Sequence, residues 1–114
     1  MKKLNKKYVS GRNFEYRVKK YMEELGWIVF RTAGSHTVAD LVCLEDSDGY
    51  CGVALIQCKY RKGGGLSINK KEVKELEDLV NALSICGYVA FNDVNGHIML
   101  RFVGRNSLNE KGDI

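Results

Sequence analysis

Proline is absent from this chain of 114 residues, so the ends of helices and strands have to be located from glycine, asparagine and serine. Long apolar runs are also missing, and none approaches the roughly 20 residues that an α-helix needs to span a bilayer. The first seven residues are basic but lack the apolar core of a secretory signal. We therefore expect a cytoplasmic protein without a membrane partner.

Close pairs of metal-binding side chains are missing as well. None of the cysteines has Cys-x-x-Cys spacing, and the two histidines, His36 and His97, are far apart in sequence. A structural zinc site requires tight pairs of such residues, so zinc is not expected. Because disulfides are rare in a reducing compartment, we expect free thiols at all four positions. The cysteines are Cys43, Cys51, Cys58 and Cys86.

The composition is that of a folded domain with a modest positive charge. A chain of this length suffices for one domain, and 45% hydrophobic and 28% charged residues are typical of soluble proteins. The net charge of +4 is a weak signal, but basic residues gather in several short clusters. A solvated surface would explain any single cluster, whereas several clusters beside one site favour a nucleic acid partner. The clusters comprise residues 2–7, 12–20, 59–62 and 70–71.

Apolar residues at helical spacing predict two helices. The first covers residues 11–25, with Ser10 as N-cap and Gly26 as the residue that ends it. The second begins after Asn69, which we interpret as an N-cap with Glu72 at the capping-box position. Gly87 is expected to end this second helix.

Runs of β-branched and aromatic residues predict five strands. They cover residues 27–32, 38–44, 53–60, 88–91 and 97–103. The third strand is apolar on both faces over its first half, which places it in the middle of a sheet. The order α-β-β-β-α-β-β predicts an α/β fold with a mixed central sheet flanked by helices. We expect one domain over residues 1–103 with a basic N-terminal arm, followed by a polar, flexible tail over residues 104–114.

Three polar residues interrupt the apolar strands. Asp40 stands in the second strand, where a partly buried carboxylate is costly unless it is paired or bound to a metal. Gln57 and Lys59 project from one face of the third strand, because strand side chains alternate. Asp40 could bind a hard divalent cation together with the Gln57 side-chain oxygen and the carbonyl of Cys58. Lys59 would pair with Asp40 and stabilise charge during attack on a phosphodiester.

Glu15 offers a second carboxylate from the first predicted helix. It lies beside the apolar stripe, on the side of Val18 and Met22, so it can point along the sheet toward Asp40. A solvated surface glutamate is the alternative interpretation, and the residues alone leave both open.

Four sequence blocks resemble the PD-(D/E)xK nuclease superfamily, most closely its archaeal-type Holliday junction resolvases. The resemblance extends from about residue 8 to residue 103, and the order and spacing of the blocks are more specific than an Asp…Gln-x-Lys pattern alone. The blocks are Ser10-Gly11-Arg12-Asn13-Phe14-Glu15, Arg31-Thr32-Ala33-Gly34-Ser35, Ala39-Asp40-Leu41-Val42 and Ile56-Gln57-Cys58-Lys59.

The resemblance implies a restriction-endonuclease-like core and a site carried over residue by residue. Glu15, Asp40 and Gln57 would help to bind magnesium, with manganese as the alternative, and Lys59 would act with the attacking water. Ser35 matches a serine implicated in catalysis in the family. The resemblance places Arg12 and Arg31 against DNA and implies a homodimer acting on four-way DNA junctions. With the basic clusters, the expected DNA contacts are Lys6, Lys7, Arg12, Arg31, Arg61, Lys62 and Lys70.

Two positions depart from the superfamily pattern. The dipeptide Ala39-Asp40 replaces Pro-Asp, which changes backbone stiffness rather than ligand chemistry. Gln57 replaces the usual acidic residue, so the site has one negative charge less and its affinity for the metal should fall.

The sequence therefore predicts a magnesium-dependent endonuclease that introduces paired, symmetric nicks in four-way DNA junctions during recombination and repair. Two alternatives stay open. One is a nuclease of the same fold that acts on other DNA, as in restriction or replication. The other is a DNA-binding protein of this fold that has lost catalysis.

Overall fold

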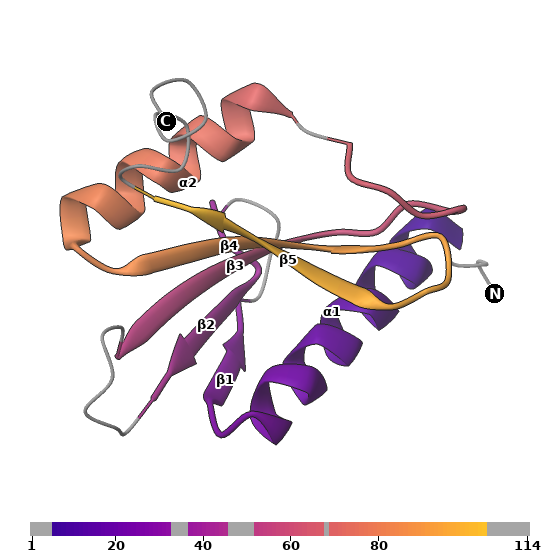
Figure 1. Ribbon diagram of the computed structural model, residues 1–114, viewed down its shortest axis with the longest axis horizontal. Helices are drawn as coiled ribbons and strands as arrows, with labels where there is room; N and C mark the ends of the chain where they lie inside the picture. Colours follow the sequence, from indigo (N-terminus) through magenta and orange to yellow (C-terminus); the bar gives the residue numbers. More distant parts are fainter. Residues whose placement is uncertain (1–5, 33–36, 46–51, 68, 105–114) are drawn as a thin grey trace, which may run out of the picture.

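The computed structural model describes residues 6–32, 37–45, 52–67 and 69–104 (Figure 1). Within them the chain forms two helices and five strands in the order α-β-β-β-α-β-β, as the sequence predicts. The elements are α1 (Lys6–Glu24), β1 (Ile28–Arg31), β2 (Leu41–Leu44), β3 (Val53–Lys59), α2 (Lys70–Leu83), β4 (Cys86–Asn92) and β5 (Ile98–Val103). None of these helices is long and apolar enough to cross a membrane.

The five strands form one mixed sheet in the order β1-β2-β3-β4-β5. Only β3 and β4 run parallel, because α2 carries the chain back between them, whereas all other neighbours are antiparallel. The third strand is central and buried over residues 54–57, which confirms its predicted place.

The two helices cover opposite faces of the sheet (Figure 1). Helix α1 packs Phe14, Val18 and Met22 against β1, β2 and β3. Helix α2 packs Leu76 and Val80 against β4 and β5. Each helix therefore buries one apolar stripe against the sheet.

Helix α1 begins earlier than its sequence suggests. It starts at Lys6, so the prediction of Ser10 as N-cap is wrong: Ser10 and Gly11 lie inside the helix, where both are partly buried. These two small residues line an open cleft with the end of β3, and a Cβ at Gly11 would meet nothing within 4 Å. The predicted end is confirmed, because Gly26 has a φ of +102° and Trp27 N–H donates to the Met22 carbonyl (3.1 Å).

Helix α2 has the predicted beginning and a different end. Asn69 is the N-cap, as expected, and its side chain accepts hydrogen bonds from the N–H groups of Lys71 and Glu72. The helix ends at Leu83, with Ser84 at a φ of 57°, so the prediction that Gly87 ends it is wrong. Gly87 lies within β4, where a Cβ would come 2.9 Å from Val80 Cγ1. Close packing of α2 on β4, rather than helix termination, requires this glycine.

The buried side chain of Asn92 fixes the segment that follows β3. Asn92 Oδ1 accepts a hydrogen bond from the Arg61 N–H (2.9 Å), and its amide group donates one to the Arg61 carbonyl (2.8 Å). The Asn92 carbonyl accepts another from the Gly65 N–H (2.7 Å). The chain is thus held against the end of β4 directly after the strand that carries Lys59.

The cysteines only partly follow the prediction of free thiols. Cys43 and Cys58 are free, and burial raises the pKa of the Cys43 thiol to about 12. Burial, with Asp40 nearby, also raises the pKa of the Cys58 thiol, so neither is a reactive thiolate near neutral pH. Cys86 is disulfide-bonded, and for this residue the prediction is wrong. Cys51 lies outside the described residues.

Candidate active site

Asp40 stands immediately before β2 rather than within it, which corrects the predicted start of this strand. Its N–H donates to the Ile56 carbonyl (2.8 Å), and its carbonyl accepts from the Thr32 N–H (2.9 Å). Its Oδ2 accepts a hydrogen bond from the Cys58 N–H (2.7 Å). If β2 began earlier, a backbone carbonyl of that strand would accept from this N–H instead. The carboxylate is therefore oriented where β2 and β3 stop pairing.

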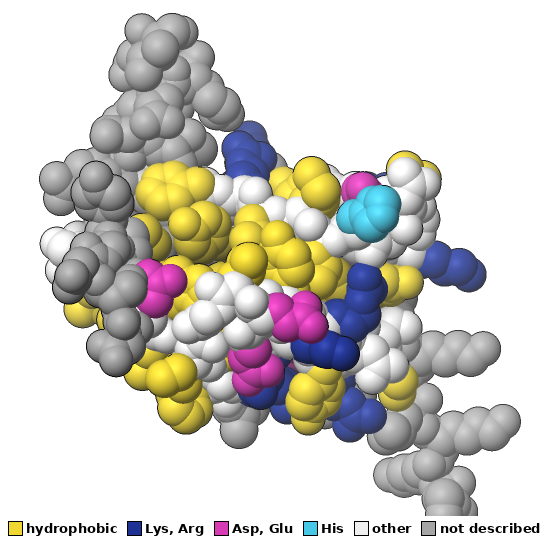
Figure 2. All heavy atoms as spheres, turned by 60° about the horizontal axis from the view of Figure 1, so that its bottom comes forward, with side chains coloured by type: hydrophobic (Ala, Val, Ile, Leu, Met, Phe, Trp, Pro, Cys, Tyr) yellow, Lys and Arg dark blue, Asp and Glu magenta, His cyan; other side chains and the backbone are white. Residues whose placement is uncertain are grey.

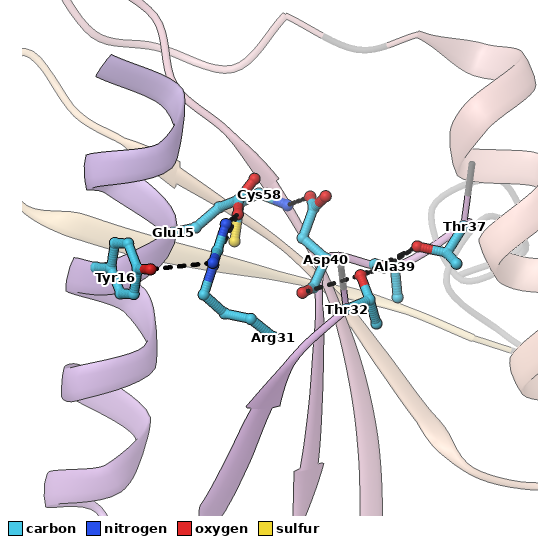
Figure 3. A network of polar contacts seen from close by, with 8 residues as sticks. All are labelled: Glu15, Tyr16, Arg31, Thr32, Thr37, Ala39, Asp40 and Cys58. Atoms are coloured by element: carbon cyan, nitrogen blue, oxygen red, sulfur yellow. Dashed lines mark hydrogen bonds and ion pairs between the residues drawn. The ribbon is translucent and has the colours of Figure 1, made fainter. Parts of the chain in front are cut away.

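Two threonine hydroxyls anchor the backbone before Asp40, and sequence reasoning did not single them out. The hydroxyl oxygens of Thr32 and Thr37 lie 2.8 and 2.7 Å from the Ala39 carbonyl oxygen and 3.1 Å from each other (Figure 3). Isolated threonines beside a turn are too common in sequences to signal such a role.

The Asp40 carboxyl group has a raised pKa. Desolvation by burial is the main cause, and the negative charges of Glu15 and Glu72 add to it. The Cys58 N–H and the charge of Lys59 act in the opposite direction without cancelling the shift. The folded protein thus holds a buried carboxylate whose negative charge is only partly offset by its neighbours, which is a common property of functional sites.

Glu15 points toward this site from α1. Arg31 on β1 donates from Nε (3.2 Å) and Nη2 (3.0 Å) to Glu15 Oε1, and its Nη1 lies 3.1 Å from the Tyr16 hydroxyl oxygen (Figure 3). The Arg31 guanidinium also lies over the Tyr16 ring, 4.5 Å from its centroid. Glu15 is therefore partly buried and ion-paired rather than freely solvated, and Tyr16 is a neighbour that the sequence did not reveal.

Gln57 carries an unsatisfied oxygen inside the protein. The residue is 7% exposed, and its amide nitrogen donates to the Val38 carbonyl (3.2 Å). Its Oε1 is buried without a hydrogen-bond partner in the described part of the chain. Leaving such an acceptor unpaired costs about 1–3 kcal/mol, which a cation or donor from a ligand would offset.

Lys59 pairs with Glu72 on α2, so the predicted direct contact with Asp40 is wrong. Lys59 shares the sheet face of Leu55, which packs beneath α2, because side chains alternate along β3. Glu15 comes from α1 on the opposite face, so Glu15 and Lys59 approach Asp40 from two sides. In the sequence, Glu72 is distinguished only by its capping-box position, which does not indicate this contact.

The end of β3 borders two open clefts. One, of about 760 Å³, lies against Ser10 and Gly11 of α1, and the other, of about 730 Å³, lies against Asn69 and Glu72 at the start of α2. Lys59, Tyr60 and Arg61 line both. These volumes are in the range of ligand sites, and a strand end with basic residues on two sides suits a phosphate backbone.

The basic residues predicted to contact DNA differ in their exposure to solvent. Arg61, Lys62 and Lys70 are exposed, whereas Arg12 is partly buried. On the face seen in Figure 2, Lys and Arg side chains lie beside Asp and Glu side chains, so this surface is mixed rather than uniformly basic. Ser35 lies outside the described residues, as do the side chains of Lys6 and Lys7.

The donors that could hold a metal are oxygens. Among the described residues, no three His, Cys, Asp or Glu side chains converge to hold an ion. Two carboxylates are available, from Glu15 and Asp40, together with the neutral side-chain oxygen of Gln57 and the Cys58 carbonyl. The Cys58 carbonyl lies on the same side of β3 as the Cys58 N–H, which points to Asp40. This set fits a hard cation such as magnesium, and the unpaired Gln57 Oε1 is the observation that favours it.

Comparisons with known proteins show the family and the fold of this chain. The sequence profile of the archaeal Holliday junction resolvase (Hjc) family matches residues 6–113. That match includes most of the segment 104–114, predicted to be a flexible tail, which lies outside the described residues except for Gly104.

Among solved structures, the chain is similar to Archaeoglobus fulgidus Hjc, described as a Holliday junction resolvase from an archaeal hyperthermophile. The TM-score is 0.66 at 23% identity, over 82% of this chain and 73% of that chain. This likeness confirms the predicted fold class. A search of curated proteins returns no significant match.

Proposed function

The chain belongs to the archaeal Holliday junction resolvase family of DNA endonucleases, and we propose that it cuts four-way junctions through a site built on Glu15, Asp40, Gln57 and Lys59. The observation that carries this assignment is the buried Asp40 carboxylate immediately before β2, together with the unpaired Gln57 Oε1 near the end of β3. The Cys58 N–H gives Asp40 one hydrogen bond, which does not cancel the effect of its burial, and Gln57 Oε1 has no hydrogen-bond partner among the described residues.

We propose that Glu15, Asp40, Gln57 Oε1 and the Cys58 carbonyl hold a divalent cation, magnesium or manganese. When bound, such a cation supplies Lewis-acid stabilisation of the negative charge that develops on the phosphate. The Cys58 N–H keeps the Asp40 carboxylate oriented, and Lys59 contributes a second positive charge beside the reacting phosphate. Ser35 keeps the catalytic role that the resemblance implies.

The DNA contacts proposed around this site are basic. Exposed Arg61 and Lys62 lie just after β3 and line the clefts beside Lys59, and exposed Lys70 begins α2 next to Asn69, which lines one of these clefts. Arg12 and Arg31 would contact DNA from the side of α1, together with Lys6 and Lys7. A DNA substrate also agrees with the cytoplasmic location that the sequence predicts.

We propose that the enzyme works as a homodimer, since one chain carries one site and paired nicks on symmetry-related strands require two. An apolar strip suited to such a contact lies on β1 and β2, on the sheet face against which α2 packs. It consists of Ile28 (55% exposed), Phe30 (55%) and Leu44 (37%).

A cleavage assay tests the proposed function. Labelled four-way junctions, duplexes and single strands of matched sequence are incubated with the protein in magnesium, and products are mapped on denaturing gels. We expect nicks at symmetric positions on opposite strands near the junction centre, with little cutting of duplex. Equal cutting of duplex would show a nuclease with another target. Junction binding without cleavage in magnesium or manganese would show a protein that has lost catalysis.

Replacing Gln57 with glutamate is expected to tighten magnesium binding. The new carboxylate adds one negative charge beside Asp40, but it also faces the Val38 carbonyl that now accepts from the Gln57 amide. We therefore expect a lower melting temperature without metal, a larger rise on adding magnesium, and a lower magnesium concentration for half-maximal cleavage. Thermal denaturation and cleavage titrations measure these effects. An unchanged magnesium requirement would show that residue 57 does not contact the metal.

A further inference from the structure

The ion pair between Lys59 and Glu72 joins the strand that carries the site to the helix on the α2 side of the sheet. We propose that Glu72 is a positioning residue that holds the Lys59 ammonium away from Asp40, so that the Asp40 carboxylate stays available for a cation. This inference rests on the proposed roles of Asp40 and Lys59 and adds a residue that the Asp…Gln-x-Lys pattern does not contain.

Glu72 itself is held in place by the start of α2. Asn69 Oδ1 accepts the Lys71 N–H (3.0 Å) and the Glu72 N–H (3.2 Å), which fixes the first turn of the helix. An anionic side chain in this turn is also favoured by the helix dipole. The carboxylate is therefore presented to β3 from a rigid position.

The backbone of Lys59 is equally constrained, whereas its side chain is not. Lys59 pairs with Phe91 in the parallel ladder, and two residues later the Arg61 N–H donates a hydrogen bond to the Asn92 side chain. The long side chain keeps many rotamers unless its ammonium is bound. Among the described residues, Glu72 provides the polar contact that Lys59 Nζ makes.

The charges around Asp40 explain why the position of this ammonium matters. Asp40 Oδ2 accepts the Cys58 N–H and makes no ion pair with Lys59, although the charge of Lys59 acts on it. Without Glu72, the Lys59 ammonium would be free to turn toward Asp40, on which its charge already acts, and an ammonium bound there would compete with a metal cation. Because Gln57 adds no charge of its own, the site has little negative charge to spare for such a competitor.

Magnesium binding in a set of four variants tests this inference. Glu72→Gln keeps the side-chain shape and the capping ability of glutamate, and Glu75→Gln on the same helix is the control. We expect Glu72→Gln to weaken magnesium binding, measured by calorimetry without DNA, by about 10-fold or more. Adding Lys59→Met to Glu72→Gln should restore the affinity to that of Lys59→Met alone, because the competing ammonium is gone. Glu75→Gln should bind magnesium as the wild type does.

Cleavage of junctions provides the second measurement. Single-turnover cleavage by Glu72→Gln should fall by about 10- to 100-fold while junction affinity without metal stays within about twofold of the wild type. An unchanged magnesium affinity in Glu72→Gln, or a loss that Lys59→Met does not reverse, would overturn the inference. The proposed function is judged separately: it fails if the wild type does not cleave junctions, if it cuts duplex equally well, or if Lys59→Met cleaves at the wild-type rate.

Discussion

Replacing Asp40 with asparagine is expected to reduce junction cleavage by about 10³-fold, since a metal site supplies several kcal/mol of transition-state stabilisation. Asparagine has nearly the same shape, and its side-chain oxygen can still accept the Cys58 N–H that now binds Asp40 Oδ2. The negative charge is what the variant loses. Junction affinity without metal should stay close to that of the wild type, because the phosphate contacts come from other residues.

The same variant is expected to be more stable than the wild type without metal. The pKa of Asp40 is raised in the folded protein, mainly by burial, so folding favours the neutral form of this carboxyl group. Stability therefore falls as the pH rises from the unfolded pKa, near 3.8, through the folded pKa, and it stays lower above both. Asparagine carries no charge and avoids this cost near neutral pH.

Melting temperatures measured from pH 3 upward check this prediction. The difference between Asp40→Asn and the wild type should be largest near about pH 7 and should shrink toward about pH 3, where the wild-type carboxyl group is protonated. Asp78→Asn, at an exposed position on α2, is the matched control and should show no such gain. Magnesium should stabilise the wild type but not Asp40→Asn. A variant that is less stable at neutral pH, or that still cleaves junctions, would contradict the assignment of Asp40.

Gly64→Ala is expected to destabilise the protein by about 3 kcal/mol, the sum of a left-handed backbone penalty and overpacking. Gly64 has a φ of +86°, and a Cβ there would lie 2.4 Å from the Asp93 carbonyl carbon and the Val94 nitrogen. Backbone atoms cannot move aside as a flexible side chain can. The turn after β4 and the segment after β3 would have to separate, which would also strain the hydrogen bond from the Arg61 N–H to the Asn92 side chain.

The neighbouring glycine provides a control for this experiment. Gly63 has the same φ of +86° but nothing within 4 Å of the position of a Cβ, so Gly63→Ala should cost only the backbone penalty of about 1–2 kcal/mol. Chemical denaturation of both variants measures the two losses. Equal losses would show that the close approach of Gly64 to the turn at Asp93 does not limit stability.

Local patterns identified most elements and the carboxylate at the centre of the site. Apolar periodicity located both helices and all five strands, because each element buries one face and repeats with its own period. Asp40 could be recognised from the sequence because a carboxylate among apolar residues needs a physical reason. Element boundaries were less certain, since Ser10 and Gly87 have the chemistry of helix ends, but Ser10 lies inside α1 and Gly87 lies within β4, close to α2.

Partners across the fold could not be predicted in the same way. Glu72 lies 13 positions after Lys59, and Asn92 lies 31 positions after Arg61, so no local periodicity connects either pair. The sequence pattern pointed to Asp40 as the partner of Lys59. The crossover through α2 instead places Glu72 beside Lys59, because parallel pairing of β3 and β4 requires a helix on that face.

The site proposed for metal-dependent cleavage therefore depends on both the sequence and the tertiary structure. The sequence by itself determined the order of elements and the candidates Asp40, Gln57 and Lys59, because these depend on residue type and local spacing. The resemblance of its sequence blocks to a known family added Glu15. Tertiary structure alone decided how the charges are distributed: Arg31 binds Glu15, Glu72 binds Lys59, and Gln57 Oε1 stays unpaired. Charge pairing depends on distance in space, and only the packing of both helices against the sheet sets those distances.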